Sequence, residues 1–148
     1  MVSFNNLGFV RSVNSGKGLD VPNASIDSGA RLQQYAFVPQ QANQRFRFSR
    51  LNDGYYRVTA LHSGKVLDVA LGSLDNGAAI VQWDWHGGSN QRFAVEEIDS
   101  SKFIIRAKHS GKVLDVAFAS RDNGAAIIQH DHVGGLNQQW EFSVPFDD

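Results

Sequence analysis

The chain has 148 residues, 42% hydrophobic and 20% charged, which suits one compact domain with a buried core better than two. Its formal net charge of −1 offers no positive field for nucleic acid or an anionic membrane surface. Because there is no cysteine, disulfides, thiolate metal sites and catalytic thiols are excluded.

The N-terminal sequence MVSFNNLGFVRSVNSG has neither a basic leader nor the apolar segment of a secretory signal. No window approaches the run of about 18 apolar residues that a membrane-spanning helix needs. We therefore expect no membrane insertion. The expected location is the cytoplasm, or outside the cell after release without a classical signal peptide, unless the chain is a fragment of a longer secreted protein.

The first pattern along the chain is NSGKGLDVP at residues 14–22, in which Asp20 stands among aliphatic residues. The turn signal Ser15-Gly16 precedes the aspartate. The residues that follow at characteristic spacings are Gly29, Tyr35, Asn43, Gln44 and Phe46.

The same pattern then occurs twice more. HSGKVLDVA at residues 62–70 returns letter for letter at residues 109–117. The spacings from Asp68 lead to Gly77, Trp83, Asn90, Gln91 and Phe93, and those from Asp115 lead to Gly124, His130, Asn137, Gln138 and Trp140. The three aspartates lie 48 and 47 residues apart (68 − 20 and 115 − 68). Three units, about 6–53, 54–99 and 100–148, thus fill a single domain spanning residues 1–148.

Within each unit the apolar residues alternate, which predicts strands. The segments 55–61, 78–85, 102–108 and 138–144 are rich in β-branched and aromatic residues, and we see no helix. In Asp75-Asn76-Gly77 and Asp122-Asn123-Gly124, the Asn-Gly pair suits the left-handed dihedrals of a tight hairpin.

Four short strands in each of three units indicate an all-β fold of about twelve strands. An open array would leave exposed strand edges, so closure about a pseudo-threefold axis is expected. A three-bladed propeller is the rival closure, but propellers typically need at least four blades. The predicted fold is therefore a β-trefoil.

Alternation also assigns side chains to faces. If Leu67 and Val69 face the core, Asp68 faces outward. Gln91 shares a face with Phe93 and should be buried with backbone partners, which leaves Asn90 outward. Each unit is thus expected to display an aspartate, an aromatic ring and an asparagine on its surface.

The three Gln-x-aromatic endings (Gln44-Arg45-Phe46, Gln91-Arg92-Phe93, Gln138-Gln139-Trp140) resemble the Gln-x-Trp repeat of the ricin B-type β-trefoil lectins. SGKVLDVA, DNGAAIVQW and GGSNQRF resemble the cysteine-free bacterial and fungal branch of that superfamily. The resemblance covers the chain from about Asn6 to Phe142. It implies a lectin for galactose- or N-acetylgalactosamine-containing glycans, with up to three shallow sites that act together and no cofactor.

In that family the aspartate accepts hydrogen bonds from sugar hydroxyls, the aromatic residue stacks on the ring and the asparagine completes the network. Carried over by position, the sites are Asp20, Gln33, Tyr35 and Asn43 in the first unit, Asp68, Trp83, His86 and Asn90 in the second, and Asp115, His130 and Asn137 in the third. Only the second has Trp, the largest stacking surface, whereas His130 gives less apolar area and a pH-dependent charge.

Other interpretations of these residues stay open. The aspartates can cap turns, and Trp83 can be a packed aromatic. The pair His130 and His132 lacks a third metal ligand nearby, and no catalytic motif is present, so neither a metal site nor an enzyme is expected. The alternative functions are a targeting module of a toxin or glycoside hydrolase and a trefoil protease inhibitor. Both monomer and homodimer are compatible with the family.

Overall fold

The computed structural model describes residues 6–143, and the flanking residues 1–5 and 144–148 of the predicted domain lie outside them. The strands are β1 (Leu7–Ser12), β2 (Gly18–Asp20), β3 (Gln33–Tyr35), β4 (Phe46–Arg50), β5 (Tyr56–Ala60), β6 (Val66–Val69), β7 (Ile80–Trp83), β8 (Phe93–Glu97), β9 (Lys102–Ala107), β10 (Val113–Val116), β11 (Ile127–His130) and β12 (Trp140–Ser143). Six 3-10 turns join them: η1 (Pro22–Ala24), η2 (Ala42–Gln44), η3 (Ala70–Gly72), η4 (Ser89–Gln91), η5 (Ala117–Ala119) and η6 (Leu136–Gln138). No helix in residues 6–143 is long and apolar enough to cross a membrane.

Six of the strands close into a barrel. Strand β1 pairs with β4, β4 with β5, β5 with β8, β8 with β9, β9 with β12 and β12 with β1, all antiparallel. Each unit supplies two of these strands. Closure removes the exposed edges that an open array would have.

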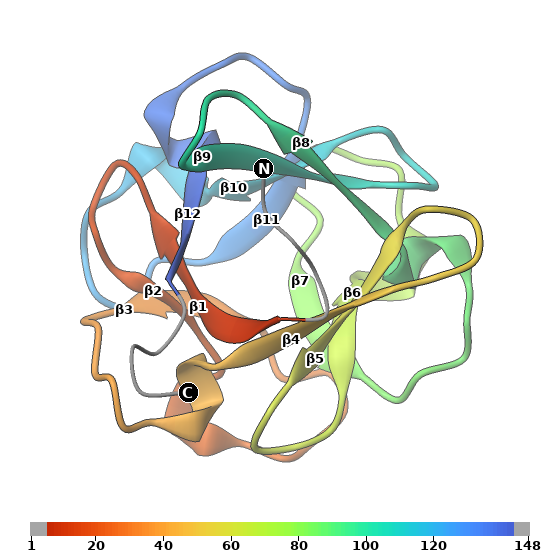
Figure 1. Cartoon of the computed structure of the whole chain (residues 1–148), viewed down its shortest axis with the longest axis horizontal. Coiled ribbons are helices and arrows are strands. Elements are labelled where there is room, and N and C mark those ends of the chain that lie inside the picture. Colours follow the sequence, from red (N-terminus) through yellow and green to blue (C-terminus); the bar gives the residue numbers. More distant parts are fainter. Residues whose placement is uncertain (1–5, 144–148) are drawn as a thin grey trace.

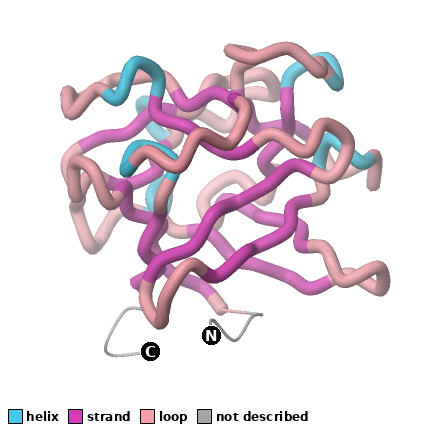
Figure 2. The backbone as a smooth tube through the Cα atoms, turned by 90° about the horizontal axis from the view of Figure 1, so that it is seen from above, coloured by secondary structure: helices cyan, strands magenta, loops and turns pink. Residues whose placement is uncertain are grey.

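The other six strands form three hairpins, β2–β3, β6–β7 and β10–β11, one for each unit. Each hairpin also pairs with the first strand of its unit, so the units repeat the same path around the centre of the molecule (Figure 1). The predicted all-β trefoil with pseudo-threefold symmetry is confirmed. The 3-10 turns lie among the loops in the upper half of Figure 2.

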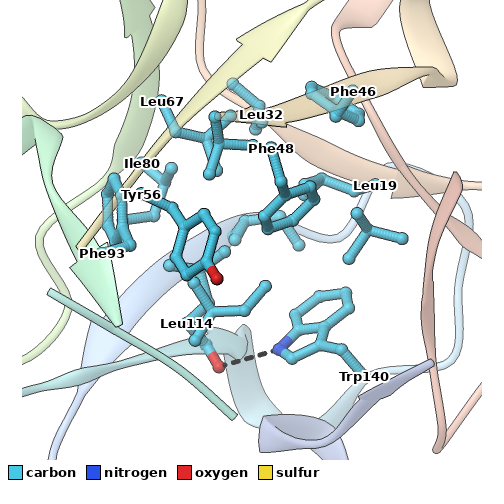
Figure 3. Packing of buried hydrophobic residues seen from close by; sticks show 14 of the residues in the cluster. Leu19, Leu32, Phe46, Phe48, Tyr56, Leu67, Ile80, Phe93, Leu114 and Trp140 are labelled. Carbon is cyan, nitrogen blue, oxygen red and sulfur yellow. Dashed lines mark hydrogen bonds between the residues drawn. The ribbon is translucent and has the colours of Figure 1, made fainter. Parts of the chain in front are cut away.

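The core takes the same positions from every unit. The Leu and Val that flank each aspartate and the closing aromatic are at most 1% exposed: Leu19, Leu67, Leu114, Val21, Val69, Val116, Phe46, Phe93 and Trp140. Burying each such side chain stabilises the fold by about 1.5–3 kcal/mol. Figure 3 shows the three leucines and the three aromatic residues of this set converging, with the Trp140 indole N–H donating to the Leu114 carbonyl oxygen at 3.3 Å. The aliphatic residues therefore face the core as predicted.

The predicted Ser-Gly turns are present. Gly77 and Gly124 also have left-handed φ values, +90° and +88°, but the tight hairpin predicted at Asn-Gly is wrong. Gly64 has a φ of +74°, and its N–H donates to the Ala60 carbonyl at 2.9 Å. By contrast, residues 70–79 join β6 to β7, and they include η3. The Asn76 side chain is held elsewhere, because its Oδ1 accepts the backbone N–H of Asp131 in the third unit at 2.8 Å.

A buried glutamine just before each aromatic position ties neighbouring units together. The Gln82 side-chain amide donates to the carbonyl oxygens of Ser25 and Asp27, at 2.8 and 2.9 Å. Its Oε1 accepts the Ser63 hydroxyl at 2.8 Å. The equivalent glutamines, Gln34 and Gln129, repeat these bonds to the third and second units, so the network closes around the molecule.

Candidate functional site

A cavity of about 400 Å³ lies against the β6–β7 hairpin of the second unit. Four of its lining residues are those predicted for this unit from the sequence: Asp68, Trp83, His86 and Asn90. The hairpin supplies the first two residues, and the segment that leads into η4 and η4 itself supply the others. The structure therefore brings this predicted set together.

The prediction that the repeated aspartates face outward is wrong. Asp20, Asp68 and Asp115 are only 3%, 4% and 5% exposed. Alternation places Asp68 opposite the core, but η4 covers that face of β6, and the Gln91 side-chain amide donates to Asp68 Oδ2 at 2.9 Å. The carboxylate therefore lines the cavity from a buried position.

The Asn90 side chain, predicted to point outward, also makes hydrogen bonds within the protein. Its side-chain amide donates to the Val69 carbonyl at 3.1 Å and, over a longer 3.4 Å, to Asp68 Oδ1. Gln91 is structural as predicted, because its Oε1 accepts the backbone N–H of His86 at 2.9 Å and its amide also donates to the Asp84 carbonyl at 2.9 Å. The asparagine and glutamine together fix the position of the carboxylate.

Burial raises the pKa of the Asp68 carboxyl above its ordinary value, an effect that the Gln91 hydrogen bond and the nearby His86 partly oppose. His86 Nε2 lies 3.8 Å from Asp68 Oδ2. The imidazole is oriented by its other nitrogen, since Nδ1 accepts the backbone N–H of Gly88 at 2.9 Å. A Cβ at Gly88 would lie 2.6 Å from the His86 ring, so a larger residue there would displace the imidazole.

Trp83 supplies the exposed aromatic surface of the cavity. It is 44% exposed, as a stacking residue must be. A Cβ at Gly29 of the first unit would lie 3.5 Å from the Trp83 ring, so the preceding unit supports its edge. Trp85, by contrast, does not line the cavity, and the guanidinium groups of Arg57 and Arg92 lie 5.0 and 5.5 Å from its ring.

The turn η3 forms a further wall of the cavity. Leu71, which lines it, has a φ of +60° and a fully exposed side chain. The equivalent residues of the other units, Asn23 and Phe118, have φ values of +57° and +60°. This left-handed conformation is unfavourable for a leucine or phenylalanine, and strained backbone of this kind gathers at ligand sites.

The first unit has a second cavity, of about 320 Å³, that includes all four residues predicted there: Asp20, Gln33, Tyr35 and Asn43. Gln33 donates to Asp20 Oδ1 at 3.0 Å, and Gln44 donates to Oδ2 at 2.9 Å. Tyr35 is 43% exposed, whereas Asn43 is 8% exposed. The predicted outward position of the asparagine is therefore wrong here, because its amide donates to the Val21 carbonyl at 3.0 Å.

In the third unit the same framework surrounds Asp115. Asn137 donates to its Oδ1 at 3.3 Å and Gln138 to its Oδ2 at 2.9 Å. Burial raises the pKa of Asp115, and a positive charge on the half-buried His130 would lower it. The three predicted residues are therefore neighbours, with an imidazole in place of the larger aromatic ring.

No three His, Cys, Asp or Glu side chains within residues 6–143 gather in a way that could hold a metal ion. The sequence interpretation missed two other features of the 400 Å³ cavity in the second unit. One is η3, and the other is the contribution of the first unit, Gly29 and Arg31. The repeated role of the glutamines at 34, 82 and 129 could have been recognised from the sequence, because Gln precedes the aromatic position in every unit.

Two solved structures share both the fold and part of the sequence. The designed threefold-symmetric protein ThreeFoil is 41% identical, with a TM-score of 0.91 over 94% of this chain and 99% of its own. An exo-β-1,3-galactanase from Clostridium thermocellum, 1,3Gal43A, is 29% identical, also with a TM-score of 0.91, over 98% of this chain. This chain spans only 31% of the galactanase.

A more distant structure shows the fold alone. The Macrolepiota procera ricin B-like lectin, solved in complex with lactose, is 18% identical, with a TM-score of 0.82 over 98% of this chain and 99% of its own. A comparison with curated proteins gave no match.

The family described as ricin-type beta-trefoil lectin domain-like matches residues 4–83 and 42–130, which together take in most of the sequence. This cysteine-free chain therefore belongs to the ricin-type β-trefoil lectin domain-like family.

Proposed function

We propose that the chain is a lectin for glycans that contain galactose or N-acetylgalactosamine, with up to three shallow sites. One observation carries the proposal: in the second unit a half-exposed Trp83 and a buried, positioned Asp68 line the same cavity. An apolar ring beside a fixed carboxylate matches the two faces of a galactose-type sugar, one of C–H groups and one of hydroxyls.

Each residue then has a defined role in the second site. Asp68 Oδ1, whose contact with Asn90 is long, accepts a sugar hydroxyl, and Trp83 stacks on the C–H face of the ring. His86 donates or accepts at the rim of the cavity. Because the Asn90 amide group is already engaged, Asn90 positions the carboxylate and meets the sugar through its carbonyl oxygen.

The choice of a galactose-type sugar rests on the relatives. The Macrolepiota procera lectin was solved with lactose and the C-half of an earthworm R-type lectin with N-acetylgalactosamine, and the Clostridium thermocellum relative is a galactanase.

In the first unit the proposed contacts are Asp20, Gln33, Tyr35 and Asn43, and in the third they are Asp115, His130 and Asn137. The three aromatic positions differ, so the three affinities should differ.

A shallow site of this kind should bind a monosaccharide with a Kd on the order of 1 mM, or about −4 kcal/mol. Several sites facing a glycan-rich surface can add a factor on the order of 10². We propose binding without catalysis, because the repeated carboxylates are buried, held by amides and located in separate units.

A second candidate function is that of a targeting module within a longer protein. The observation that favours it is the galactanase, in which a segment matching 98% of this chain makes up 31% of the enzyme. In that case the sugar site is the same, and the biological role is to hold a catalytic or toxic domain at a glycan.

A glycan array tests the proposal directly. We expect signals on galactosides or N-acetylgalactosaminides, and we expect Trp83→Ala to remove most of the signal because the stacking surface is lost. Trp85→Ala is the matched control, since Trp85 does not line the cavity. An array without any such signal, or equal losses in both variants, would contradict the proposal.

A further inference from the structure

One wall of the cavity in the second unit comes from the first unit and carries a positive charge. Gly29 and Arg31 both line the cavity, and an isolated antiparallel bridge pairs Arg31 with Val81, another lining residue. Side chains of directly opposed residues stand about 5 Å apart. The stem of Arg31 therefore runs beside Val81, which leaves its guanidinium at the edge of the cavity.

The other units lack this charge. The same bridge pairs Ala79 with Ile128 at the third unit, and Ala126 with Gln33 at the first. An alanine at this position contributes only a small apolar wall. Arg31 thus makes the second site chemically different from the other two, although the aspartate and its glutamine are the same.

The guanidinium of Arg31 is unpaired within the described chain. Arg31 is exposed, and its side chain makes no hydrogen bond, ion pair or ring contact with any of residues 6–143. Two cations of the second unit, by contrast, are engaged: Lys65 lies 3.4 Å from Asp84, and Arg92 donates to the Gly87 carbonyl at 2.9 Å. The charge of Arg31 is therefore available to a ligand.

We propose that Arg31 makes the second site selective for galactosides that carry an anionic group, a sulfate or a carboxylate. The proposal rests on the sugar-binding function proposed above. The planar guanidinium can form two parallel, charge-assisted hydrogen bonds with the oxygens of either group. Asp68 repels an anion from the opposite side, so the sugar hydroxyls face Asp68 and the anionic substituent faces the first-unit wall.

The indole N–H signal of Trp83 in a ¹H–¹⁵N spectrum reports on this site alone. We would titrate the full chain with galactose, galactose 3-sulfate, galactose 6-sulfate and galacturonic acid, which separates sulfate from carboxylate and one ring position from another. At least one anionic ligand should bind about two- to five-fold more tightly than galactose, the range expected for an exposed ion pair. Added salt should reduce this advantage.

Three variants assign the preference to Arg31. Arg31→Ala should abolish the advantage of the anionic ligand over galactose, and Arg31→Lys should retain part of it, because lysine keeps the charge but loses the planar fork. Arg121→Ala removes an equal charge from an arginine that does not line the cavity and should leave the preference intact.

The outcomes separate the two proposals. If galactose and every anionic ligand bind wild type equally, or if Arg31→Ala keeps the preference, the role of Arg31 is overturned and the lectin function stands. If no ligand moves the Trp83 signal, the sugar-binding function itself is overturned, and the role of Arg31 with it.

Discussion

The repeated aspartate is the residue on which the proposed function depends most. A buried carboxylate costs free energy unless partners compensate, and burial raises the pKa of Asp68 and Asp115 although Gln91 and Gln138 donate hydrogen bonds to them. A residue that served only to hold the fold would gain from being neutral. The aspartate stands in all three units, and this agrees with the proposed role in which a sugar hydroxyl donates to it.

Replacing Asp68 by asparagine tests this explanation through pH. The Asp68 carboxyl has an ordinary pKa of 3.8 in the unfolded chain and a higher pKa in the folded protein. At pH values between these two pKa values, the unfolded chain has lost this proton and the folded protein still holds it. The free energy of unfolding of the wild type therefore falls as pH rises from 3.8 to the folded pKa. Asp68→Asn has no carboxyl group to ionise at this position, so its free energy of unfolding does not fall in this way. Urea unfolding at about pH 3 and pH 7 should show wild type losing stability relative to the variant as pH rises.

The opposite trend would mean that the folded carboxylate is stabilised by its surroundings. Asp68 would then be a structural residue, as in a turn cap, and the binding role would lose its support. Both proteins contain the same remaining carboxyl groups, so the difference between their stabilities isolates Asp68.

Strand alternation explains which of these placements could be predicted from the sequence. It assigns Leu67 and Val69 to the core correctly. It fails to predict the burial of Asp68. The pattern of a strand shows only that Asp68 lies on the face opposite the core, and it does not show that η4 covers that face. Arg31 could not be assigned to the second site at all, since its contact with Val81 joins two different units.

At the scale of the elements, the turn after each aspartate stores strain beside a proposed site. Leu71 and Phe118 have left-handed backbone and are fully exposed, so neither packing nor burial compensates for the conformation. Asparagine tolerates this region better, and the first unit has Asn23 at the same place. The apolar residues are therefore better explained by contact with a ligand than by stability.

Leu71→Asn should raise the free energy of unfolding by about 0.5–1 kcal/mol, because asparagine relieves part of the left-handed strain. Leu74→Asn is a matched control, as Leu74 is 60% exposed and is not among the residues with positive φ. Urea denaturation of both variants gives the comparison. If Leu71→Asn is no more stable than Leu74→Asn, the turn is not strained in solution.

At the scale of the whole molecule, polar contacts join all three units as the glutamine network does. Asp53, at the end of the first unit, accepts hydrogen bonds from Arg92 of the second at 3.1 Å and from Lys108 of the third at 2.9 Å. The Lys108 hydrogen bond is the main reason that the pKa of Asp53 falls to about 2. The threefold arrangement could be predicted because the spacings repeat, but these cross-unit pairs could not.

Asp53→Asn should lower the free energy of unfolding by about 0.2–1 kcal/mol at neutral pH, the value of an exposed ion pair. A depressed pKa stabilises the fold above the ordinary value of 3.8, and this contribution is lost as pH falls through about 2. The difference between wild type and variant should therefore vanish in strong acid. Asp122→Asn, at an exposed position, should show no such difference at either pH.

The central claim is that a sugar binds over Trp83 and against Asp68, and a lactose titration followed by the three indole N–H signals tests it most directly. Trp140, buried and bonded to Leu114, is an internal control. We predict that the Trp83 signal shifts with a Kd on the order of 1 mM, that the Trp140 signal stays in place, and that Asp68→Asn abolishes the shift. A Trp83 signal that does not move at lactose concentrations far above that Kd, or that moves equally in Asp68→Asn, would contradict the account.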